Sequence, residues 1–152
     1  MAERIADLGV LRRLLSGFVA GFFATLIFHQ LMLGVLWLVG LSPVRPFSMA
    51  LTHPFGVPAV FSLALWGGVW GMLYALIEGG FSGSAGHWIF AFLFGAFLPS
   101  LVALLIVLPL KGRPMGNGWH PPLLVAAFLV NGAWGVGTKL ILGMLRRPSG
   151  RT

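Results

Sequence analysis

The stretch Trp88–Leu110, WIFAFLFGAFLPSLVALLIVLPL, decides the fold of this chain, because it contains no charged residue. A helix needs about 20 apolar residues to cross the ~30 Å hydrocarbon core of a bilayer, and this stretch has that length. Gly95 and Pro99 do not exclude a helix, since neighbouring helices in a membrane can satisfy the backbone groups that they free. We therefore predict a transmembrane helix here.

Working outward, three other stretches have the same length and character: Leu14–Val39, Val57–Ile77 and Leu123–Leu145. The connections between the four stretches are Gly40–Gly56, Glu78–His87 and Lys111–Pro122. None of these connections is long enough to form a soluble domain. The sequence thus predicts an all-α integral membrane protein with four transmembrane helices, and residues 1–152 form a single transmembrane domain.

Composition supports this fold class. Hydrophobic residues make up 58% of the chain and charged residues 9%, whereas soluble domains carry about 45–50% and about 25%. The chain has no cysteine, which excludes thiolate metal sites and covalently attached haem. The formal net charge of +7 does not predict nucleic-acid binding, because the basic residues flank the apolar stretches as membrane-orienting residues do.

Basic residues also predict the orientation. One side of the membrane receives the two ends of the chain and the Glu78–His87 loop. That side holds Arg4, Arg12, Arg13, Arg146, Arg147 and Arg151, and the other loops hold only Arg45, Lys111 and Arg113. The side richer in lysine and arginine is the cytoplasmic one, so we expect both termini in the cytoplasm. The basic ends should favour anionic lipid head groups.

An internal repeat links the two halves of the chain. The first outer loop reads Arg-Pro at position 45 and His-Pro at position 53, and the helix that follows contains Trp70-Gly71. The second reads Arg-Pro at position 113 and His-Pro at position 120, before a helix that contains Trp134-Gly135. We expect two parallel repeats, residues 14–78 and 87–145, that form a four-helix bundle.

Small residues indicate where these helices touch, because close approach in lipid depends on them. The glycines that we expect at helix contacts are Gly17, Gly21, Gly67, Gly71, Gly95 and Gly137. They all fall toward the cytoplasmic half. The bundle should therefore be tight on that side and wider in its outer half.

Three polar residues lie within the apolar stretches: His29, Gln30 and Asn131. Polar side chains at such depth are costly unless they face a partner or a cavity. We expect interhelical hydrogen bonds, with His29 or Gln30 bonded to a carbonyl or to Asn131, and ligand binding is the alternative. Near the cytoplasmic surface, Glu78 and Lys139 lie at a similar level, and a pair between them would be structural and modest in value.

The repeated residues Arg45, His53, Arg113 and His120 should form an outer rim that suits an anionic lipid or another acidic partner. The alternative is simple anchoring at the interface. His29, His53 and His120 are also weak candidates for a metal site, and two of them could ligate a haem. We expect no resident cofactor, so metal or haem remains a minor alternative.

No catalytic constellation is present, because three acidic residues leave no carboxylate dyad at one depth and the phosphate-loop signature is missing. Read together, Gly17–Gln30 (GFVAGFFATLIFHQ), His53–Pro58 (HPFGVP) and Val130–Gly137 (VNGAWGVG) resemble small four-helix membrane proteins of proteobacteria that have no assigned activity. The resemblance covers nearly the whole chain and implies a bacterial inner-membrane location, but it carries over no functional residue.

Three functions remain open from the sequence. The first is a non-enzymatic accessory or assembly subunit, with other membrane subunits or a second copy as partner. The second is a small oligomeric transporter or channel whose pathway starts in the outer half. The third is a haem or metal protein that uses the outer histidines.

Overall fold

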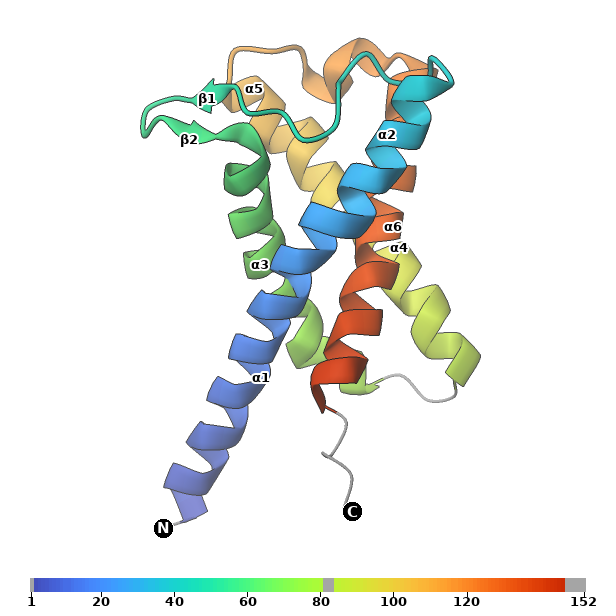
Figure 1. Cartoon of the computed structure of the whole chain (residues 1–152). Helices are drawn as coiled ribbons and strands as arrows, with labels where there is room; N and C mark the ends of the chain where they lie inside the picture. Colours follow the sequence, from blue (N-terminus) through green and yellow to red (C-terminus); the bar gives the residue numbers. More distant parts are fainter. Residues whose placement is uncertain (1, 81–83, 147–152) are drawn as a thin grey trace.

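The computed structural model describes residues 2–80 and 84–146, and four long helical segments dominate it (Figure 1). Each segment is long and apolar enough to cross a membrane: Asp7–Leu38, Ala59–Ile77, Ala85–Leu110 and Pro121–Arg146. The predicted all-α, multi-pass membrane fold is therefore confirmed. Arg147, Arg151 and residues 81–83 of the predicted cytoplasmic loop lie outside the described residues, as does the side chain of Arg4.

The first and third spans are each built from three helical elements, and short elements flank the second span and precede the fourth. The first span comprises α1 (Ala2–Ala24), the π-helical turn η1 (Thr25–His29) and α2 (Gln30–Leu38). A short antiparallel pair, β1 (Leu51–Thr52) and β2 (Val57–Pro58), leads into α3 (Ala59–Ile77) and η2 (Glu78–Gly80). The rest consists of α4 (Ser84–Val102), the π-helical η3 (Ala103–Val107), α5 (Leu108–Leu110), η4 (Met115–Trp119) and α6 (Pro121–Arg146).

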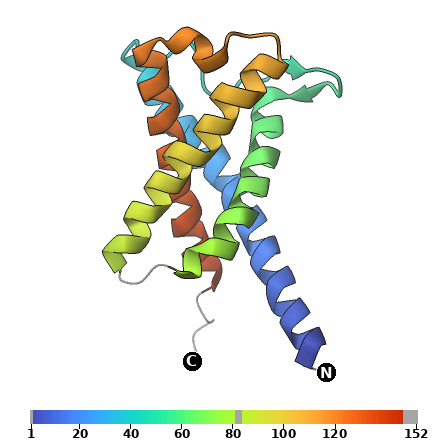
Figure 2. The same cartoon turned by 180° about the vertical axis from the view of Figure 1, so that it is seen from behind.

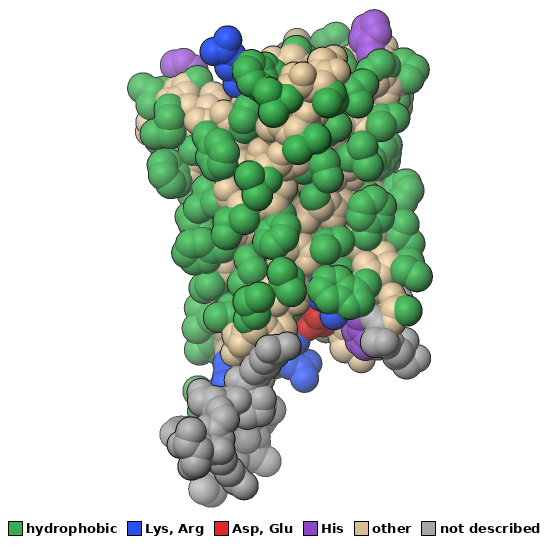
Figure 3. Space-filling model, turned by 45° about the vertical axis from the view of Figure 1, so that its right-hand side comes forward, with side chains coloured by type: hydrophobic (Ala, Val, Ile, Leu, Met, Phe, Trp, Pro, Cys, Tyr) green, Lys and Arg blue, Asp and Glu red, His purple; other side chains and the backbone are tan. Residues whose placement is uncertain are grey.

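The two ends of the chain lie at the same end of the bundle, opposite the two long loops (Figures 1 and 2). Hydrophobic side chains cover the side wall of the bundle between its two ends, and the charged and histidine side chains gather near these ends (Figure 3). A wall of this kind is stable against lipid or another apolar surface, because so much apolar surface in water would be very costly.

Glycines bring α1 and α3 into backbone contact. A Cβ atom added to Gly21 would lie 2.9 Å from Gly71 Cα, and one added to Gly17 would lie 2.5 Å from the Gly71 carbonyl oxygen. A Cβ atom on Gly67 would overlap the hydroxyl of Thr25. Any larger residue at these positions would force the two helices apart.

A second crossing of the same kind joins α4 to α6. A Cβ atom added to Gly95 would lie 2.9 Å from Gly135 Cα, and one added to Gly135 would overlap the Ala91 carbonyl oxygen. The α6 residue in this contact is thus Gly135. Gly137 lies about half a helical turn further round α6 and packs against the ring of Phe28 in η1.

An aromatic cluster joins the two helix pairs. Phe94 of α4 lies at its centre, with ring centroids 5.4 Å from Tyr74, 6.3 Å from Trp70 and 6.4 Å from Trp134. Trp134 also donates a hydrogen bond from Nε1 to the carbonyl oxygen of Gly21, at 2.9 Å. This bond ties α6 directly to the α1–α3 crossing.

The bundle widens at both ends. Above the crossings, α2 and α3 separate toward the loop end, as the distribution of small residues predicts (Figures 1 and 2). The other end is not tight, however, because α1 and α4 run away from each other there in both views. That part of the prediction is wrong: the glycine crossings lie in the middle of the bundle, so helices that cross there at an angle must diverge in both directions.

Candidate functional site

Gln30 is a buried tether for the first outer loop. Its side chain is 2% exposed, and its Oε1 atom accepts a hydrogen bond from the backbone N–H of Phe47 at 2.6 Å. Its Nε2 atom lies 3.3 Å from Nδ1 of the neighbouring His29. The expected partner was a carbonyl or Asn131, so that prediction is wrong. Gln30 directly follows the π-helical turn η1, whose wider turn changes the direction of the side chains after it.

Asn131 forms a separate polar contact between α4 and α6. Its Nδ2 atom donates to Ser100 Oγ at 3.0 Å, and this hydroxyl donates to the backbone oxygen of Ala127 at 3.2 Å. Ser100 is fully buried. Both interactions are interhelical hydrogen bonds, so Asn131 serves packing within the second helix pair and does not reach Gln30.

The four residues predicted to form an outer rim all belong to the loop-end region, but each has its own surroundings. Arg45 stacks its guanidinium over the ring of Trp37, 5.4 Å from the centroid. Arg113 donates to the side-chain oxygen of Asn117 at 3.1 Å. His53 and His120 are exposed.

His53 lines a hollow of about 300 Å³ in the loop-end surface. Residues from both halves of the chain surround it: Thr52, His53, Pro54, Phe55, Val57, Ser62, Leu65, Trp66 and Lys111. The cation at this hollow is therefore Lys111, which the sequence analysis counted only for orientation. His120 and the two rim arginines do not line it.

The histidines are not brought together as a metal site. In residues 2–80 and 84–146, no three side chains of the metal-binding types His, Cys, Asp and Glu lie close enough to hold an ion. His29 belongs to the membrane-spanning part of the chain, and His53 and His120 lie in separate loops. The geometry therefore gives no support to a site made of these three residues.

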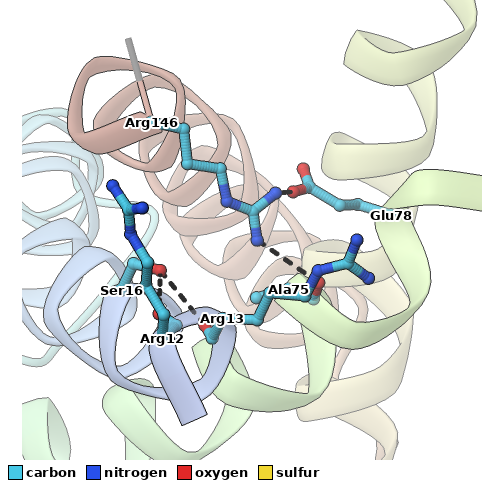
Figure 4. Close-up of polar contacts among 6 residues, drawn as sticks. All are labelled: Arg12, Arg13, Ser16, Ala75, Glu78 and Arg146. Atoms are coloured by element: carbon cyan, nitrogen blue, oxygen red, sulfur yellow. Dashed lines mark hydrogen bonds and ion pairs between the residues drawn. The ribbon is translucent and has the colours of Figure 1, made fainter. Parts of the chain in front are cut away.

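A charged cluster lies at the opposite end of the bundle, where the termini are (Figure 4). Arg146, at the end of α6, forms an ion pair with Glu78 and donates a second hydrogen bond to the Ala75 carbonyl oxygen at 3.4 Å. Lys139, which lies at a similar level in the sequence, does not take this place and lies over the ring of Trp88, 4.5 Å from its centroid. Lys139 precedes Arg146 by about two turns of α6 and lies beside α4.

Comparisons with protein-family models, with curated proteins and with solved structures found no match to this chain.

Proposed function

We propose that this protein is a non-enzymatic accessory or assembly subunit of a larger complex in a bacterial inner membrane. One observation carries the proposal: four polar side chains inside the spans hold parts of the chain itself together. Gln30 holds a loop, Asn131 holds a neighbouring helix, and the Thr25 and Thr138 hydroxyls bond to carbonyl oxygens one turn earlier. Such bonds stabilise a helical scaffold and leave these groups engaged.

The outward face supports the same proposal, since it presents large apolar and aromatic side chains. Trp66 on α3 is 64% exposed, and Phe23 on α1 and Phe97 on α4 are each 47% exposed. Aromatic side chains are enriched where proteins bind each other. Transport through one copy is disfavoured, because the glycine crossings bring each helix pair into backbone contact.

Crosslinking in native membranes tests the proposal. A photoreactive phenylalanine analogue would replace Phe23, Trp66 or Phe97, one position at a time, in the full-length protein. We expect protein adducts of one defined mass from one of these faces, with the other faces as internal controls. Three faces without protein adducts, together with a monomer that elutes alone from mild detergent, would contradict the proposal.

We also propose that the chain is a duplicated hairpin. The contacts of the two crossings support this: Gly21 meets Gly71 as Gly95 meets Gly135. The ring of Phe18 in α1 covers Gly68 in α3. In the second pair, the ring of Phe92 in α4 covers Gly132 in α6 in the same way. Phe92 and Gly95 of α4 follow their α1 counterparts, Phe18 and Gly21, by the same number of positions.

The duplication proposal is tested by truncating equivalent residues of the two hairpins. A Cβ atom added to Gly68 would lie 2.6 Å from the Phe18 ring, and one added to Gly132 would overlap the Phe92 ring. Truncation of either ring, Phe18→Leu or Phe92→Leu, is expected to lower the stability of the bundle to a similar degree. A large loss for one variant and none for the other would argue against equivalent hairpins.

Both termini are placed in the cytoplasm in this proposal. The support is the excess of basic residues at the end of the bundle where the chain begins and α6 ends (Figure 1). A reporter that is active only in the cytoplasm should be active when it is fused to either end. Activity at one end only would contradict four spans in this orientation.

A further inference from the structure

An apolar groove lies between the start of α1 and the end of α6. It is a shallow hollow of about 430 Å³ that is open over most of its extent. The residues that line it are Leu8, Leu11, Arg12, Leu15, Ser16, Val19 and Leu145. Leu8, Leu11 and Leu15 form one stripe along α1, because residues three and four positions apart share a helix face. Their exposed fractions are 65%, 51% and 60%.

Arg12 is the charged residue in this lining. Its guanidinium points away from the Glu78–Arg146 pair (Figure 4) and has no hydrogen-bond or ion-pair partner within the part of the chain that the structure describes. The Ser16 hydroxyl is engaged, since it donates to the Arg12 backbone oxygen at 2.6 Å. The groove therefore combines a long apolar surface with one available cation.

The charge around this end of the groove is positive. Arg12, Arg13 and Arg146 lie near the Glu78 carboxylate (Figure 4), and the exposed Asp7 precedes Leu8 of the lining, so these arginines outnumber these carboxylates by one. Arg146 pairs with Glu78, and the Arg12 side chain has no partner among the described residues, so its charge remains for a ligand. Arginine binds phosphate through paired N–H donors, which suits a phosphodiester group.

We propose that this groove binds one anionic phospholipid of the adjacent leaflet, with its phosphate on Arg12 and an acyl chain along Leu15 and Val19. The apolar lining favours a lipid over a free anion, because only a lipid has an acyl chain that would cover Leu15 and Val19. A second copy of this chain does not suit the groove. A twofold contact would place the same arginines of both copies against each other, and such like charges repel.

Native mass spectrometry of the full-length protein tests the proposal. The protein would be released from bilayers of equal parts phosphatidylglycerol and phosphatidylcholine with identical acyl chains. We expect one retained phosphatidylglycerol. The variant Arg12→Gln should lower the ratio of retained phosphatidylglycerol to phosphatidylcholine about fivefold, since one basic residue near the membrane surface contributes about that factor. Lys139→Gln, whose ammonium lies over Trp88 and does not line the groove, is the charge control and should leave the ratio unchanged.

A second pair of variants tests the acyl-chain part without changing charge. Leu15→Trp should fill the groove and abolish retention of both lipids, whereas Leu38→Trp, at a 77% exposed position near the loop end, should not. Both positions face outward, so neither variant should alter thermal unfolding. The proposal is overturned if Arg12→Gln keeps the wild-type ratio or Leu15→Trp keeps the lipid. It is also overturned if millimolar inorganic phosphate displaces the bound lipid, because the site would then recognise a free anion.

Discussion

The variant Gly71→Ala tests the glycine crossing most directly, because it adds one methyl group where α1 and α3 touch. The new Cβ atom would overlap the Gly17 carbonyl oxygen and would lie 2.9 Å from Gly21 Cα. Non-bonded carbon atoms prefer separations of about 3.5–4.0 Å, so the helices would have to move apart by about 1 Å.

The expected loss of stability follows from three contributions. Overpacking a well-packed contact costs about 1–3 kcal/mol. The shift would also weaken the 2.9 Å hydrogen bond from Trp134 to the Gly21 carbonyl, and such a bond contributes about 0.5–1.5 kcal/mol. Replacing a mid-helix glycine by alanine returns about 0.5–1 kcal/mol. The free energy of unfolding should therefore fall by about 1–3 kcal/mol.

Reversible unfolding in mixed micelles, by titration with a denaturing detergent, measures this difference. Tryptophan fluorescence follows the transition; among the six tryptophans, Trp134 is 2% exposed in the folded bundle, so unfolding should change its surroundings. The control is Gly143→Ala in α6, where an added Cβ atom would meet nothing within 4 Å, so stability should stay equal or rise slightly. Equal unfolding midpoints for the two variants would refute the close crossing.

Three further outcomes are expected. Gln30→Leu removes the acceptor of the Phe47 N–H and should speed hydrogen exchange at that amide by at least about fivefold, whereas Gln30→Glu keeps an acceptor and should change the rate less. A double-mutant cycle of Glu78→Gln and Arg146→Gln should give a coupling energy of only about 0.2–1 kcal/mol, because the arginine is 37% exposed, and a larger value would show a stronger pair than the structure indicates. Asn131→Leu should lower the free energy of unfolding by about 0.6–1.7 kcal/mol, and no loss would mean that its hydrogen bond to α4 contributes nothing.

The spans could be predicted from the sequence because a single property, apolar length, defines them. The predicted stretch Trp88–Leu110 lies within the observed span Ala85–Leu110, and the predicted Val57–Ile77 is nearly the same as the observed Ala59–Ile77. The start of the first helix was missed. The segment before Leu14 contains charged residues that lower its hydropathy, although several of them are good helix formers.

The polar partners could not be predicted in the same way. Gln30 bonds to a backbone group of the loop, and its direction depends on η1, a π-helical turn that composition does not indicate. The sequence predicts Gly137 at a helix contact and places Gly135 only in the repeat, because spacing alone does not show which of these two glycines faces α4. Only the rotation of α6 about its own axis decides which of these faces α4.

The helical path from Ala2 to Leu38 is continuous through α1, η1 and α2, and at ~1.5 Å per residue it is about 55 Å long. The same rod therefore carries the arginines at one surface of the membrane and, through Gln30, the loop at the other. A protein that bound the first turns of this helix and tilted it would also move the first outer loop, because Gln30 of the same continuous helix bonds to that loop. The glycine contact with α3 lies between the two ends of this helix, so a tilt about that contact would move the two ends in opposite directions.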